Sequence, residues 1–232
     1  MDLRNLIVNK VDNANSLLSQ HPIAKGLVEG GVSLIPFLGT AITGTLNTRA
    51  ALLFERNTTL LTNELKTQVH RLSENKIDRE FLDSDEFTFL ILDVLAKNAY
   101  TYEEVKTQLF AQILINSTLK GTSSTPYKEG FVRIVSDLSA QHIQIFTAVF
   151  RKAQTFTGQH QINNEDYVKA QEIAGEAELT QSRTIAYCEE LIRYGLLSDW
   201  SVGRWEYQRG LYSVTDYGAE FASFLMSHVS ES

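Results

Sequence analysis

The sequence has little cysteine and little proline: one cysteine, Cys188, and three prolines in 232 residues. A single cysteine excludes a disulfide within this chain and any metal cluster built from cysteines alone, and it fits a reducing compartment. The chain also lacks an excess of basic residues, since 28 acidic side chains stand against 21 basic ones, for a net charge of −7. This charge disfavours a protein whose main task is binding phosphate backbones. The 43% of hydrophobic residues can nevertheless bury a core.

Common catalytic and targeting motifs are also lacking. There is no P-loop, GxGxxG or GxSxG motif, and none of the five histidines has a second His or Cys at a recurrent ligand spacing. Glu189 follows Cys188 and opposes thiolate formation, so we expect Cys188 to be a small core residue. We therefore expect no enzyme, no cofactor and no metal site. The N-terminus has no basic region followed by an unbroken apolar run, and we expect a cytoplasmic protein.

Residues 30–48 form an uncharged, glycine-rich segment of 19 positions, GGVSLIPFLGTAITGTLNT. The length suits a membrane-spanning helix, but Pro36, four glycines and several hydroxyl side chains lower its hydropathy. Pro36 is expected to divide the segment into two short helical pieces. Either the segment is a hairpin buried in a helical bundle, or it conditionally enters a membrane or packs against a partner's helix. The residues expected to form that membrane or partner surface are Ile35, Pro36, Phe37, Leu38, Gly39, Ile42 and Gly44.

Apolar residues at helical spacing predict that the first 120 residues are all-helical. Four helices are expected. They cover residues 3–20, about 46–74, 85 to about 98, and a last stretch that starts at the Thr101 capping box and runs to about residue 119. Ser84 is the expected N-cap of the third of these helices, and Thr101 with Glu104 forms a capping box for the fourth. Asn57 interrupts the apolar stripe of the second helix. We expect Asn57 to face solvent, the alternative being that it specifies packing register.

Residues 121–126, GTSSTP, form a cluster of helix breakers and predict a domain junction between 1–120 and 127–232. Beyond it, helices are expected at about 127–138, 140–155, 165–177 and 180–195. A β-hairpin of residues 196–202 and 210–214 and a last helix opening at Thr215 complete a winged-helix domain. The predicted fold is mainly α, with an N-terminal helical bundle carrying a glycine-rich apolar hairpin and a C-terminal winged-helix (α+β) domain.

A winged helix can contact DNA through the start of its second core helix and through its wing. The residues expected to touch nucleic acid or a partner are Thr180, Gln181, Arg183, Arg204, Trp205 and Arg209. Residues 127–232, however, hold 9 basic side chains and 14 acidic ones, and carboxylates beside a phosphate backbone repel it. The charge favours a protein partner over DNA, and the aromatic residues of the predicted wing could form its contact surface.

Several segments of the sequence together resemble those of a known group of proteins. They are the run GVSLIPFLGTAITG, the stretch Lys76–Phe87, Glu103-Glu104-Val105-Lys106, Phe110–Ser117, and the winged C-terminal part. This layout resembles a widespread group of small bacterial proteins, some of which are similar to abortive-infection proteins of the alpha type. The sequence departs from the pattern at Val105, where a third charged residue often stands, and in a more polar glycine-rich run. The resemblance implies architecture rather than a catalytic activity.

The resulting hypothesis is a non-enzymatic bacterial defence or stress protein. Its glycine-rich segment would associate conditionally with a membrane or partner, at the periphery of the inner membrane when triggered, and its winged helix would dock or sense a partner. A protein partner or self-association is expected, and no small-molecule substrate is identified. The alternatives are a winged-helix DNA-binding regulator, disfavoured by the acidic charge, and an assembly or scaffold subunit.

Overall fold

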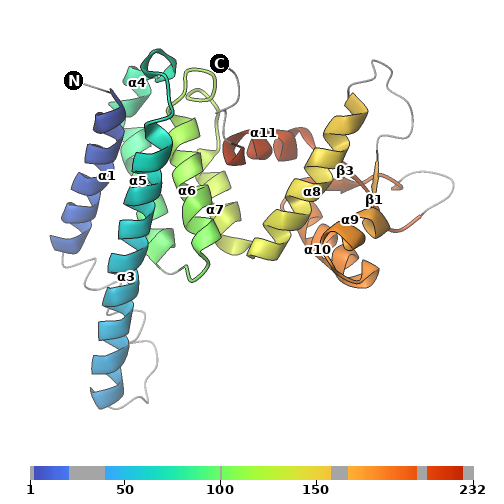
Figure 1. The fold of residues 1–232 in the computed structure, drawn as a ribbon, viewed down its shortest axis with the longest axis horizontal. Helices are drawn as coiled ribbons and strands as arrows, with labels where there is room; N and C mark the ends of the chain where they lie inside the picture. Colours follow the sequence, from blue (N-terminus) through green and yellow to red (C-terminus); the bar gives the residue numbers. More distant parts are fainter. Residues whose placement is uncertain (1–2, 21–39, 100, 158–166, 203–207, 227–232) are drawn as a thin grey trace. The chain divides into compact units, whose positions relative to one another are not determined.

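The computed structural model describes residues 3–20, 40–99, 101–157, 167–202 and 208–226. These residues are mainly helical, with three short strands toward the C-terminal end (Figure 1). Contacts divide the chain after Ser136 into two compact units, the second of which is Asp137–Met226. No helix in the described ranges is both long and apolar enough to cross a membrane.

The first unit is a bundle around one long helix, α3 (Thr40–Val69). α3 packs against α1 (Leu3–Gln20), α5 (Asp85–Ala99) and α6 (Glu104–Ser117), and Figure 1 shows α1 and α3 side by side. The shorter elements η1 (Glu74–Lys76) and α4 (Arg79–Leu82) follow α3 in the chain. Helical spacing of apolar residues builds the core, which includes Ile7, Val11, Leu61, Leu65, Phe87, Ile91, Val94, Phe110, Ile113 and Leu114.

Helix α7 (Lys128–Asp137) is bound to the first unit by the side chains of two lysines. Lys128 Nζ lies 2.7 Å from Glu86 Oε1 of α5 and 4.4 Å from the ring centre of Phe81 in α4. Lys106 Nζ of α6 donates to the carbonyl of Ser136 at 2.9 Å. These contacts hold α7 to the bundle, so the expected junction at 121–126 lies inside the first unit. The predicted ranges 1–120 and 127–232 differ from the two units chiefly because α7 belongs to the first unit.

Capping explains several helix boundaries of the bundle. The predicted helix over residues 3–20 is α1, and the third predicted helix is α5, where Ser84 Oγ accepts from Phe87 N at 3.2 Å. α3 begins at Thr40, within the uncharged segment and earlier than predicted. The predicted capping box of Thr101 and Glu104 is wrong, because the N-cap of α6 is Glu103.

The expectation that Asn57 faces solvent is also wrong. Asn57 is 2% exposed, and its Nδ2 donates to the carbonyls of Asn98 at 2.9 Å and Thr101 at 2.8 Å. Because these carbonyls end α5 and begin the turn before α6, the Asn57 side chain takes over part of their hydrogen bonding. Thr101 N donates to the Asn98 carbonyl at 3.2 Å, so the N–H that a capping box would pair with Glu104 is already bonded.

The described residues of the second unit form four helices and a three-stranded antiparallel sheet. In chain order these are α8 (Ala140–Thr157), β1 (Val168–Lys169), α9 (Ala170–Glu176), α10 (Gln181–Arg193), β2 (Leu197–Asp199), β3 (Leu211–Val214) and α11 (Asp216–Leu225). The strand order is β1-β3-β2, with Val168 opposite Tyr212 and Ser198 opposite Ser213. The predicted hairpin and last helix are present, while β1 replaces the start of a helix predicted at 165–177.

The start of α11 lies unusually close to the residue before β2. The last helix starts at Thr215, as predicted, and Thr215 is its N-cap, with Oγ1 accepting from Gly218 N at 2.9 Å. A Cβ atom at Gly218 would lie 2.1 Å from the carbonyl oxygen of Leu196. No side chain fits there, so glycine is required for this approach of helix and strand.

Candidate functional site

The glycine-rich surface predicted from the sequence is covered only in part by the described residues. Ile35, Pro36, Phe37, Leu38 and Gly39 lie outside them, and Ile42 and Gly44 lie in the first turns of α3, where the structure describes the backbone alone. Further along α3, Leu52 is 59% and Leu53 is 44% exposed. α3 thus shows an apolar surface to solvent in the half that continues from the uncharged segment.

The predicted contact residues of the second unit are only partly brought together. Thr180 is the N-cap of α10 and its hydroxyl accepts from Arg183 N, while Gln181 and Arg183 are exposed in the first turn. Arg209 lies next to β3, where its guanidinium contacts Glu189 Oε1 at 2.6 Å. Arg204 and Trp205 lie outside the described residues. The observed set is a polar helix start and one arginine held by a carboxylate.

A hydrogen-bonded histidine that sequence analysis missed connects α8 to α10. His142 Nε2 lies 2.5 Å from Glu190 Oε2, and Ser139 approaches His142 Nδ1 through its hydroxyl at 2.7 Å and its backbone N–H at 3.2 Å. The ring of His142 also meets the ring of Tyr187 edge-on at 4.6 Å. The spacing Ser139-x-x-His142 resembles a capping box, with an imidazole accepting the N-cap N–H in place of a carboxylate. This contact ties the start of α8 to α10.

Cys188 is fully buried in the core of the second unit, as predicted. Burial, together with the negative charge of Glu189, raises the pKa of the Cys188 thiol to about 12. Burial also raises the pKa of the neighbouring Tyr212. Because a nucleophilic cysteine requires a lowered pKa, this thiol is suited to packing and not to covalent chemistry.

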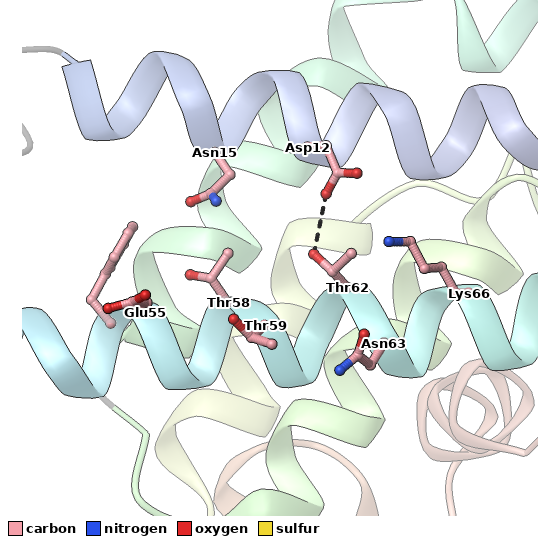
Figure 2. Close-up of a pocket in the computed structure, with 9 residues that line it drawn as sticks. Asp12, Asn15, Glu55, Thr58, Thr59, Thr62, Asn63 and Lys66 are labelled. Atoms are coloured by element: carbon pink, nitrogen blue, oxygen red, sulfur yellow. Dashed lines mark hydrogen bonds between the residues drawn. The ribbon is translucent and has the colours of Figure 1, made fainter.

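A polar groove lies between α1 and α3 in the first unit (Figure 2). Its volume is about 390 Å³, and the lining residues are Asp12, Asn15, Phe54, Glu55, Thr58, Thr59, Thr62, Asn63 and Lys66. The two residues from α1 face those from α3 across the groove, and Thr62 Oγ1 donates to Asp12 Oδ1 at 3.4 Å. Eight of the nine lining residues have polar side chains, whereas Val11 of α1 and Leu61 of α3 are apolar and fully buried.

One oxygen of this groove lacks a hydrogen bond. Asn15 Oδ1 is buried and has no partner among the described residues. A buried acceptor without a hydrogen bond costs free energy. A ligand that donates a hydrogen bond to Asn15 Oδ1 would remove this cost. On α3, polar residues from Glu55 to Lys66 recur at helical spacing beside the apolar stripe that packs in the core. This pattern indicates a polar side of the helix but not that α1 lies opposite it.

The described residues contain no group of three or more His, Cys, Asp or Glu side chains placed to hold a metal ion. Comparison of the chain with models of protein families, with curated proteins and with solved structures finds no match.

Proposed function

We propose that this protein is a non-enzymatic bacterial defence or stress protein that associates conditionally with a membrane or a partner. The uncharged segment of residues 30–48 and the exposed part of α3 supply the association surface. The second unit serves as a winged-helix domain that docks or senses a partner. The resemblance to alpha-type abortive-infection proteins supports the defence role, and association takes place at the periphery of the inner membrane when triggered.

The observation that carries this proposal is the exposure of Leu52 and Leu53 on α3. Two adjacent leucines in solvent forgo the gain of burial, about 1.5 to 3 kcal/mol for each side chain fully buried. They lie on the helix that begins inside the uncharged segment, so the segment and the leucines belong to one stretch of chain. Contiguous apolar patches of more than a few hundred Å² mark membrane or protein contacts, and in this proposal the leucines and the uncharged segment together form such a patch.

The order and pairing of the elements support a winged helix in the second unit. Three helices, α8, α9 and α10, precede the hairpin of β2 and β3, and β1 joins the sheet beside β3. The turn between α9 and α10 is tight, with Glu178 at a positive φ of 54°. This is the arrangement in which a short turn sets two helices at an angle and a hairpin extends beside them.

The charges of the second unit support a protein partner over DNA. Arg209 is held by Glu189, and Arg151 lies 3.3 Å from Glu176, so two of its cations are already paired with carboxylates. Firm DNA binding generally uses several phosphate contacts from free basic side chains. The rival proposal, a DNA-binding regulator, rests on Thr180, Gln181, Arg183, Arg204 and Arg209, of which Arg183 is exposed at the start of α10.

The proposed mechanism is a shift between two states. Burial of the segment is favoured in the resting protein, and a trigger that binds the released state more tightly moves the population toward membrane or partner contact. The trigger has to supply a difference in affinity between the two states, because equal binding to both shifts nothing.

The test is flotation of the purified protein with anionic liposomes, using variants that place a charge in the proposed surface. Gly39→Glu lies in the segment and Leu52→Glu in the exposed part of α3. We expect each variant to lower the bound fraction about tenfold or more, since a carboxylate opposes burial in an apolar phase. Equal flotation of wild type and both variants contradicts the proposed surface.

The matched control is Phe89→Glu, which puts the same charge on another apolar side chain of the first unit that is 66% exposed. It should float as the wild type does. A second arm measures DNA binding: affinity that falls steeply with salt and is weakened by Arg183→Ala supports the regulator instead. A stable oligomer that binds neither lipid nor DNA supports an assembly subunit.

A further inference from the structure

We propose that the groove between α1 and α3 binds a linear aliphatic polyamine, a chain of methylene groups carrying two or three ammonium groups. This site goes beyond the proposed function and does not depend on it. The lining residues come from the two helices that flank residues 21–39 in the sequence, so an occupant would bridge α1 and α3.

The charge of the groove favours a cation. Two carboxylates, those of Asp12 and Glu55, line it against a single ammonium group, that of Lys66. The remaining polar side chains are three threonines and two asparagines, all of which can accept hydrogen bonds. Acceptors thus outnumber obligate donors, and an ammonium group, which only donates, complements them.

The spacing of the carboxylates favours a linear molecule. Asp12 is bonded to Thr62, and Glu55 precedes Thr62 by seven residues on the same helix. At a rise of about 1.5 Å per residue, this places the two anionic ends of the groove roughly 10 Å apart along α3. If each terminal ammonium group lies beside a carboxylate, the two terminal nitrogens are also roughly 10 Å apart, which is about the span of an extended triamine.

The unpaired acceptor favours a further ammonium group between these ends. Figure 2 shows Asn15 opposite Thr58, between Asp12 and Glu55 along the groove. Asn15 Oδ1 is buried without a partner, and Thr58 is 5% exposed. When the Asn15 side chain turns toward the groove, a secondary ammonium group in the middle of a triamine supplies a donor for its Oδ1. Phe54 lines the groove and offers an apolar surface to the methylene groups.

The test is isothermal titration of the full chain with spermidine, a triamine, and with 1,4-diaminobutane, in buffer of about physiological ionic strength, where non-specific attraction is screened. We expect one spermidine per chain, bound more tightly than the diamine. Asp12→Asn and Glu55→Gln should each weaken binding about tenfold or more, because each removes a charge-assisted hydrogen bond. Asn15→Ala should remove the advantage of spermidine over the diamine.

Three controls distinguish the groove from general attraction to an acidic protein. Glu129→Gln removes one exposed carboxylate from α7, outside the groove, and should change affinity less than twofold. 1,4-Butanediol has the length of the diamine without its charge and should not bind. Lys66→Met should bind spermidine at least as tightly as the wild type.

Absence of spermidine binding to the wild type overturns the proposal, and so does an equal loss for Glu129→Gln and Asp12→Asn. Because Asp12 and Glu55 are exposed, their isosteric variants should retain the fold, which circular dichroism checks. The titration involves no lipid, so its failure is distinguishable from a failure of membrane or partner association.

Discussion

Asn57 connects three helices of the first unit through a short chain of hydrogen bonds. Its Nδ2 donates to the end of α5, and Asn98 Nδ2 of α5 donates back to the Asn57 carbonyl at 2.8 Å. Thr107 of α6 donates to Asn98 Oδ1 at 2.7 Å. A buried polar network of this kind is stabilising only while all its members are paired, so loss of one member exposes the others to the full cost of burial.

Replacing Asn57 should therefore destabilise the bundle strongly. We expect Asn57→Leu to lower the free energy of unfolding by about 2 to 3 kcal/mol, because it leaves the carbonyls of Asn98 and Thr101 short of a donor. Urea unfolding measures the change. Asn63→Ala on the exposed face of the same helix serves as control and should stay within about 0.5 kcal/mol of the wild type. A loss no larger for Asn57→Leu than for the control contradicts this account of the network.

Asp78 holds the loop before α4 to the turn that follows α6. Its Oδ2 accepts from Ser123 Oγ at 2.5 Å and its Oδ1 from Phe81 N at 3.1 Å. The hydrogen bond from Ser123, followed by that from Phe81 N, lowers the pKa of the Asp78 carboxyl below its usual value. A group whose pKa is lower in the folded chain stabilises the fold at higher pH, since on acidification the unfolded chain takes up the proton first.

The contribution of Asp78 should accordingly disappear in acid. It is complete above the ordinary pKa of an aspartate, about 3.9, and is lost as the pH falls through the lower value of the folded chain. At neutral pH we expect Asp78→Ala to cost about 1 kcal/mol, as for an N-cap residue. A double-mutant cycle with Ser123→Ala, measured by urea unfolding across acid pH, should show a coupling that shrinks with acidification. A coupling independent of pH contradicts this assignment.

At the scale of elements, α11 depends on its close approach to the chain before β2. Thr215 N donates to the Leu196 carbonyl at 3.2 Å, and the Cβ position of Gly218 is blocked by the same oxygen. The segment from Tyr212 to Gly218 thus contains the end of β3, the N-cap of α11 and the contact between Gly218 and the Leu196 carbonyl, which only glycine permits. These local requirements explain why this part of the fold was predicted well from the sequence.

Two glycine substitutions on helices should have opposite effects. Gly218→Ala requires α11 to move away from Leu196, and we expect a loss of about 1 to 3 kcal/mol, as for other overpacked sites. Gly175→Ala in α9 meets nothing within 4 Å and should raise stability by up to about 1 kcal/mol, because alanine favours the helix. Thermal unfolding of both variants measures the difference, and the same sign for both would contradict the described contact.

Other elements escaped prediction for physical reasons. β1 has two residues, too few for an alternating pattern, and it exists through pairing with β3, which is distant in the sequence. The capping box at Thr101 did not form because α6 begins two residues later than the box requires, with Glu103 as its N-cap, and because Thr101 N is bonded to the Asn98 carbonyl. The predicted cap at Ser84 and the predicted start of the last helix at Thr215 are confirmed, since a cap forms within one turn of the chain.

At the scale of the whole molecule, candidate sites could also be predicted only where composition or neighbouring residues determine them. The acidic excess and the burial of Cys188 could be predicted, because composition and sequence neighbours determine them. The α1–α3 groove and the contact between His142 and Glu190 could not, since each joins residues that only folding brings together. For the glycine-rich surface, Ile35 to Gly39 lie outside the described residues, and that prediction is carried by the sequence and by the exposed leucines of α3.

The central claim is that the uncharged segment and α3 bring the protein to a membrane or partner when it is triggered. The most direct measurement is flotation of the wild-type chain with anionic liposomes that carry a self-quenching dye. Anionic liposomes in excess bind the released state preferentially and draw the population toward it, so the account predicts that the protein rises with the liposomes and releases dye, and that Gly39→Glu does neither. Wild-type protein that remains at the bottom with the dye retained contradicts membrane association. It would assign residues 30–48 to the core of the bundle and direct the search to protein and DNA partners.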